Sequence, residues 1–167
     1  MAVLVSVLPL VGGAGCGFRR VSGEPPRVDP GAARPFAPAS MSVHPLTGVV
    51  DDALVGERVL ALYVDLQDAY GDTVKATGRL TVLLFEAEAG GTPRTIEAAL
   101  SWRIDLTEPG ENSRYFDAAT RLYRVSLAGL PASLTSPGRP PLLLRVKYET
   151  LDRSSRPQTL RDEHLVR

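Results

Sequence analysis

The sequence predicts an all-β domain that folds as an antiparallel sandwich of about seven short strands. Apolar and polar residues alternate with a period of two in several windows between residues 41 and 167. Clusters of glycine, proline and aspartate separate these windows, as turns separate neighbouring strands. No window of about eleven residues or more has the 3.6-residue period of an amphipathic helix, so we expect little helix.

Four strands are expected in the first half of the domain. After a short strand at residues 41–44, residues 58–67 alternate between leucine or valine on one face and mostly polar residues on the other, which is typical of a half-buried strand. The turn-forming residues 68–72 follow. Residues 74–87 are apolar on both faces in their middle, as in a central strand, and residues 98–106 alternate again.

Three further strands are expected in the second half. Residues 123–127 and 142–149 alternate, and a last strand is expected at 158–166 after a turn at 152–157. Burying each large aliphatic side chain on the inner faces contributes about 1.5–3 kcal/mol. The expected core consists of Leu60, Leu62, Val64, Leu80, Val82, Leu100, Trp102, Ile104, Val125, Leu144 and Val146.

The segment at residues 63–75 (Tyr-Val-Asp-Leu-Gln-Asp-Ala-Tyr-Gly-Asp-Thr-Val-Lys) resembles the strand–turn–strand unit of bacterial immunoglobulin-like (Ig-like) modules. In that family an aspartate and a glycine shape the turn between an alternating strand and its partner. The resemblance implies an Ig-like β-sandwich for residues 41–167. It carries no catalytic residue across, because it concerns the fold alone.

The N-terminus has the composition of a secretory signal. Residues 1–18 carry no charged side chain, and residues 2–11 are almost wholly apolar. This run has the length of a signal h-region and is too short to span a bilayer as a helix. Small residues at 12–15 precede Cys16, the one cysteine in the sequence, which cannot form an intramolecular disulfide. We therefore expect a signal peptide at residues 1–15.

The end of this leader resembles the lipobox of bacterial lipoproteins, with Ala14 and Gly15 at the small positions and Cys16 at the acylated position. The resemblance implies cleavage before Cys16, a diacylglycerol on its thiol and attachment to a membrane of the cell envelope. Gly13 departs from the aliphatic residue that the family prefers, and no Lys or Arg precedes Cys16. Two alternatives stay open. The leader could direct plain secretion, or it could be an N-terminal strand, which Pro9 and the glycines disfavour.

Residues 16–40 are expected to form a disordered tether. Five prolines and three glycines in this segment exclude a continuous helix or sheet ladder. A polyproline ligand for a partner is an alternative, although the proline spacing is irregular. Arginines between the prolines could add a weak contact with anionic headgroups.

The charge balance excludes a nucleic-acid partner that binds through an excess of positive charge. Nineteen Lys and Arg residues balance nineteen Asp and Glu residues. Nearly all the basic residues are arginines, and they are interleaved with acidic residues as on a solvated surface. The sequence has no P-loop and no dinucleotide-binding glycine motif, so we expect no cofactor.

The sequence predicts no catalytic residue and no metal site. His44 and His164 form no zinc-binding motif, and no nucleophile-elbow motif surrounds a serine. A secreted hydrolase remains the third hypothesis, which would need His44 beside an acid and a serine. Asp65, Asp68 and Asp72 lack the spacing of a calcium loop, which favours a role in turns.

Aromatic residues suggest the second hypothesis, a carbohydrate-binding envelope protein. Tyr63 and Tyr123 are the candidate contacts, because tyrosine rings can stack on sugars. The leading hypothesis is a non-enzymatic, lipid-anchored envelope protein that acts as a structural or interaction module. Its expected partners are membrane lipid through Cys16 and an unidentified envelope protein or glycan.

Overall fold

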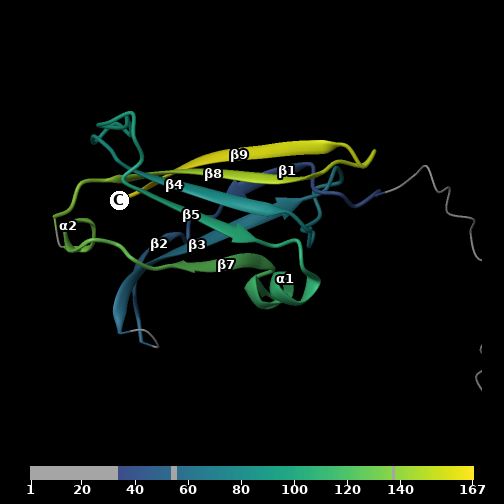
Figure 1. Ribbon diagram of the computed structural model, residues 1–167, viewed down its shortest axis with the longest axis horizontal. Coiled ribbons are helices and arrows are strands. Elements are labelled where there is room, and N and C mark those ends of the chain that lie inside the picture. The colour runs from purple at the N-terminus through teal and green to yellow at the C-terminus, as the bar shows by residue number, and fades with distance from the viewer. Residues whose placement is uncertain (1–33, 54–55, 137) are drawn as a thin grey trace, which may run out of the picture.

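The computed structural model describes residues 34–53, 56–136 and 138–167. The expected signal at residues 1–15, Cys16 and the tether up to residue 33 lie outside the described residues. The described chain forms two antiparallel sheets that face each other (Figure 1). The all-β sandwich predicted from the sequence is therefore confirmed.

One sheet has five strands and the other has four. The five-stranded sheet contains β1 (Ser40–Val43), β2 (Gly48–Asp52), β3 (Glu57–Gln67), β6 (Phe116–Asp117) and β7 (Leu122–Leu127). The four-stranded sheet contains β4 (Arg79–Glu86), β5 (Leu100–Asp105), β8 (Leu142–Leu151) and β9 (Pro157–Val166). Their orders are β1-β3-β7-β6, with β2 also beside β3, and β5-β4-β8-β9.

Strand β3 is the centre of the five-stranded sheet. It pairs with β7 on one edge and with β1 and β2, one after the other, on its second edge. Pro45 lies between β1 and β2, where its missing N–H would interrupt a ladder. The hydroxyl of Thr47 accepts a hydrogen bond from the Tyr63 N–H at 3.0 Å, which satisfies a β3 donor at this break.

The core lies between the inner faces of the two sheets. Nine of the eleven residues expected there have an exposed fraction of 8% or less. Leu100 and Trp102 are only partly buried, because β5 is an edge strand of its sheet. The Trp102 indole N–H donates to the Ala128 carbonyl at 3.0 Å, a backbone group just after β7, and so links the two sheets along this edge.

Helix content is low, as predicted. The described helices are α1 (Pro109–Tyr115) and α2 (Ala132–Thr135). Pro109 stands in the first turn of α1, where the missing N–H costs no hydrogen bond. Arg114 pairs with Glu111 at 2.9 Å on the surface of the same helix.

The expected strand at residues 74–87 is shorter than predicted, and the observed strand β4 does not pair with β3. The predicted turn forms: Asp68 Oδ1 accepts the Tyr70 and Asp72 N–H groups at 2.8 and 3.1 Å, and Gly71 has φ +87°. The chain then crosses to the opposite sheet before β4 begins. The pairing across this turn is limited to an antiparallel bridge between Gln67 and Thr73 and to the Val74 N–H, which donates to the Leu66 carbonyl at 2.8 Å. The expectation that the turn joins β3 to the next full strand as its partner is wrong, because β4 pairs with β5 and β8.

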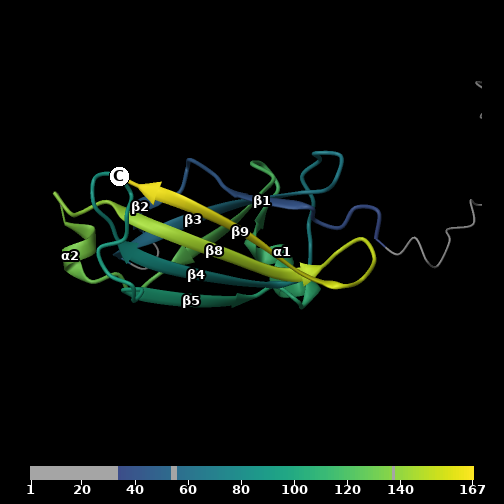
Figure 2. The ribbon, with the colours of Figure 1, turned by 90° about the horizontal axis from the view of Figure 1, so that it is seen from above.

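The two ends of the sandwich are distinct. The described chain begins near the β8–β9 turn, since Arg34 lines a cavity together with Pro157 and Gln158. Helix α1 lies toward this end (Figure 1). The C-terminus, α2 and the β2–β3 hairpin lie at the opposite end, as the view from above also shows (Figure 2). Neither described helix has the length and apolar character needed to span a bilayer.

Candidate functional site

A cluster of buried hydrogen bonds holds the segment that crosses between the sheets. We call Ala76, Asn112, Tyr123 and Tyr148 the Ala76 cluster. The Ala76 carbonyl accepts hydrogen bonds from Asn112 Nδ2 at 2.7 Å and from the Tyr148 hydroxyl at 2.6 Å. The Tyr123 hydroxyl accepts from the Ala76 N–H at 3.0 Å and lies 2.9 Å from Asn112 Oδ1. One residue is thus fixed by α1, β7 and β8 together.

The tyrosines of the Ala76 cluster are in their protonated form at neutral pH. Each is 1% exposed, and burial raises the pKa of both phenols above the ordinary value. A phenol with a raised pKa is a poor nucleophile and a poor base at pH 7. The hydrogen bonds of the cluster hold residues 75–78 against the end of the core.

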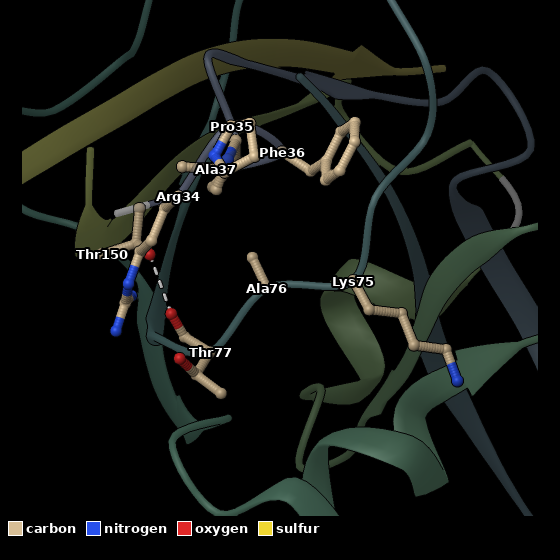
Figure 3. A pocket seen from close by; sticks show the side chains of 9 residues that line it. Arg34, Pro35, Phe36, Ala37, Lys75, Ala76, Thr77 and Thr150 are labelled. Atoms are coloured by element: carbon tan, nitrogen blue, oxygen red, sulfur yellow. Dashed lines mark hydrogen bonds between the residues drawn. The ribbon is translucent and has the colours of Figure 1, made fainter. Parts of the chain in front are cut away.

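A groove of about 290 Å³ lies beside this segment, between residues 34–38 and residues 75–77 (Figure 3). Pro35, Ala37 and Pro38 line it together with Arg34. The Thr150 hydroxyl donates to the Thr77 carbonyl at 2.8 Å across its floor. The lining has no carboxylate and no histidine, so it offers no acid–base pair.

Two side chains at the rim of this groove point away from its floor (Figure 3). Phe36 is 66% exposed. The Lys75 ammonium extends in another direction and lies 4.4 Å from the centre of the Phe116 ring. The groove is thus an open apolar trough at the end where the N-terminal segment enters.

The two histidines lie on different elements of the structure. His44 lies in the corner between β1 and β2, and its Nδ1 accepts the Leu46 N–H at 3.2 Å. His164 lies on β9, paired with Leu144. Within the part of the chain that the structure describes, no group of three or more His, Cys, Asp or Glu residues could hold a metal ion.

The acidic residues near the β3–β4 crossing are engaged locally. Asp68 caps its own turn, as described above, and its Oδ2 atom is buried without a hydrogen-bond partner among the described residues. Asp65 accepts hydrogen bonds from Thr73 at 3.2 Å and from Gln67 at 2.7 Å. These contacts agree with the turn role expected from the sequence.

Tyr63 and Tyr123 do not form a common stacking surface. They lie on neighbouring strands, but Val64, not Tyr63, is the partner of Tyr123, so the two rings are on opposite faces of the sheet. Tyr123 is buried and has no ring face open to a sugar. Tyr63 lies on the outer face, where the Arg124 guanidinium is 5.9 Å from its ring centre.

A surface that the sequence did not single out lies on the outer face of the four-stranded sheet. Four residues are in register across the strands of this sheet and form one cross-strand level. In the order of the strands they are Arg103 on β5, Thr81 on β4, Lys147 on β8 and Arg161 on β9. We call the three cations the cationic row. A hollow of about 400 Å³ covers this level and is also lined by Leu83, Arg145, Val146, Asp162 and Glu163. Both carboxylates are engaged, because Glu163 pairs with Arg145 at 2.7 Å and Asp162 accepts the Val43 N–H at 2.7 Å.

No protein-family model, no curated protein and no solved structure matches this chain.

Proposed function

We propose that this chain is a non-enzymatic, lipid-anchored protein of a bacterial cell envelope and that its β-sandwich is an interaction module. The observation that carries the proposal is the position of Cys16, the one cysteine, directly after an uncharged apolar leader and small residues. Two or three acyl chains on this residue would give a durable anchor, because each buried CH₂ contributes about 0.8 kcal/mol.

The arrangement of the sandwich supports an anchored module. The described domain begins after a segment rich in proline and glycine, which suits a spacer. Arg34 lies beside the β8–β9 turn, and the C-terminus lies at the opposite end of the sandwich (Figure 1). An anchor at Cys16 would therefore leave the end with α2 and the β2–β3 hairpin on the far side from the attachment point.

The strand order supports an Ig-like form of the sandwich. Immunoglobulin domains place strands A, B, E and D in one sheet and C, F and G in the other. Assigning A to β1, B to β3, C to β4, D to β6, E to β7, F to β8 and G to β9 reproduces these pairings. In this assignment two strands are additional: β5 at the edge beside C, and β2 beside B.

The proposal is tested by changing the acylated residue in the full-length chain. The wild-type chain and Cys16→Ser are expressed in a bacterial host and followed by membrane fractionation, with Ser22→Ala as the matched control. We expect wild type and Ser22→Ala in the detergent-soluble membrane fraction, and Cys16→Ser outside it. Globomycin, which blocks the lipoprotein signal peptidase, should leave an uncleaved wild-type precursor. Equal membrane association of Cys16→Ser and wild type, with no effect of globomycin, would refute the anchor.

A further inference from the structure

The cationic row concentrates positive charge in a chain whose formal net charge is zero. The levels on either side of it on the same sheet face contain compensating charges. Arg79 pairs with Asp105 at 3.7 Å on one side, and Arg145 pairs with Glu163 at 2.7 Å on the other. The row itself has three cations and no acidic residue on its own level.

Two of the three cations have no anionic partner within the described chain. Lys147 pairs with Glu149 at 3.1 Å, a neighbour along β8. Arg103 and Arg161 make no ion pair or side-chain hydrogen bond with any described residue. Arg161 also stands directly opposite Lys147, and like charges in this position destabilise a sheet. An anionic ligand would relieve this repulsion.

The surface around the row suits a ligand with hydroxyl groups as well as negative charge. The Thr81 hydroxyl, near the middle of the level, makes no hydrogen bond with a described residue and is only partly buried. No aromatic ring lines the hollow, which disfavours recognition of a neutral sugar by stacking. The guanidinium groups offer paired donors that match carboxylate or phosphate oxygens.

The length of the row indicates a ligand with more than one anionic group. Arg103 and Arg161 are three strand spacings apart, which is about 14 Å at the usual separation of neighbouring strands. A single small anion between them would leave at least one guanidinium unpaired. A linear polymer that crosses the strands can engage both.

We propose that the cationic row binds a linear acidic polysaccharide across the outer face of the four-stranded sheet. This inference rests on the proposed function as an interaction module and names its ligand class. An acidic peptide fits less well, because peptides usually bind sheets by adding a strand at an edge, whereas the row crosses the interior of the sheet face. A flat membrane surface fits less well because the row lies in a hollow.

The test uses the full-length chain in detergent and fluorescent polygalacturonate as the acidic polysaccharide. Its fully methyl-esterified form is the neutral counterpart, and polyglutamate and anionic phospholipid vesicles represent the two other occupants. The variant Arg103→Gln/Arg161→Gln is compared with Arg153→Gln/Arg156→Gln. The control pair removes the same charge from the exposed β8–β9 turn, where neither side chain has a described partner.

We expect polygalacturonate to bind wild type and the control equally, and the ester not to bind. The row variant should weaken binding at least about tenfold, which corresponds to about 1.4 kcal/mol. Added salt should weaken binding to wild type, because the contacts are exposed charges. The row variant should retain the thermal stability of wild type, since it removes one like-charge pair and no ion pair.

Three results would overturn the inference. They are equal binding of polygalacturonate by both double variants, equal binding of the ester, or tighter binding of polyglutamate or vesicles than of polygalacturonate. The outcome of this binding test is independent of the outcome of the Cys16→Ser test. Loss of polysaccharide binding leaves membrane fractionation unchanged, and failure of the anchor leaves binding by the purified chain unchanged.

Discussion

Replacing Gly78 by alanine should destabilise the fold, although the backbone at this position suits any residue. Gly78 is buried beside the Ala76 cluster and exchanges backbone hydrogen bonds with Leu106. A Cβ atom at this position would lie 2.5 Å from the Glu149 carbonyl oxygen and 2.6 Å from Cζ of Tyr148. It would also lie 2.8 Å from the Tyr148 hydroxyl. The first contact is with strand backbone, so a rotamer change cannot relieve it.

The expected magnitude follows from three contributions. Overpacking a well-packed interior costs about 1–3 kcal/mol. Displacing the Tyr148 hydroxyl from the Ala76 carbonyl adds about 1 kcal/mol. The lower entropy of alanine in the unfolded chain offsets this by about 0.4–1 kcal/mol. The net loss in the free energy of unfolding is therefore about 1–3.6 kcal/mol.

Denaturant titration and thermal melting of the full-length chain measure this loss. A domain of this size should melt about 4 °C lower for each kcal/mol. Gly90→Ala is the matched control, since no atom lies within 4 Å of its Cβ position and its φ is not positive. We expect the control to be neutral or slightly stabilised. A Gly78→Ala variant as stable as the control would refute the close approach of residue 78 to β8.

Three further predictions concern the same interior and the β1 edge. Tyr123→Phe leaves Asn112 Oδ1 and the Ala76 N–H without their partner and should lower the free energy of unfolding by about 1–3 kcal/mol in a denaturant titration. An unchanged free energy of unfolding would contradict the hydrogen bonds of the Ala76 cluster. Asp162→Ala removes the carboxylate that accepts the Val43 N–H at 2.7 Å and should speed amide hydrogen exchange in β1. Asp162→Asn keeps an acceptor and should leave this exchange unchanged. Equal exchange rates in the two variants would argue against this contact. Above about pH 10 the unfolded tyrosines ionise while buried Tyr123 and Tyr148 keep their protons, so the folded state binds more protons and stability should fall as pH rises. Tyr148→Phe should make this fall shallower in melts taken between pH 9 and about 11, and an unchanged slope would count against the raised pKa.

Alternation alone predicted most strands, because a strand with one buried face leaves a period of two in the sequence. Strand β2 was not predicted, because it lacks this alternation. Its sequence, Gly-Val-Val-Asp-Asp, does not alternate, and it forms a strand because it pairs with β3. Helix α1 has seven residues, too few to show a helical period.

The sequence pattern could not predict the contacts that define the Ala76 cluster and the cationic row. The Ala76 carbonyl and the Tyr148 hydroxyl are 72 residues apart in the chain, and no local spacing predicts their hydrogen bond. Arg103, Lys147 and Arg161 could each be assigned to a polar strand face from the sequence. Only the register of β5, β4, β8 and β9 brings them to one level.

Intact mass spectrometry of the mature protein tests the anchored-module account most directly. The account predicts a polypeptide that starts at Cys16 and is heavier than residues 16–167 by a diacylglyceryl group, with or without a further acyl chain. A mature chain of unmodified mass that retains residues 1–15 would contradict it.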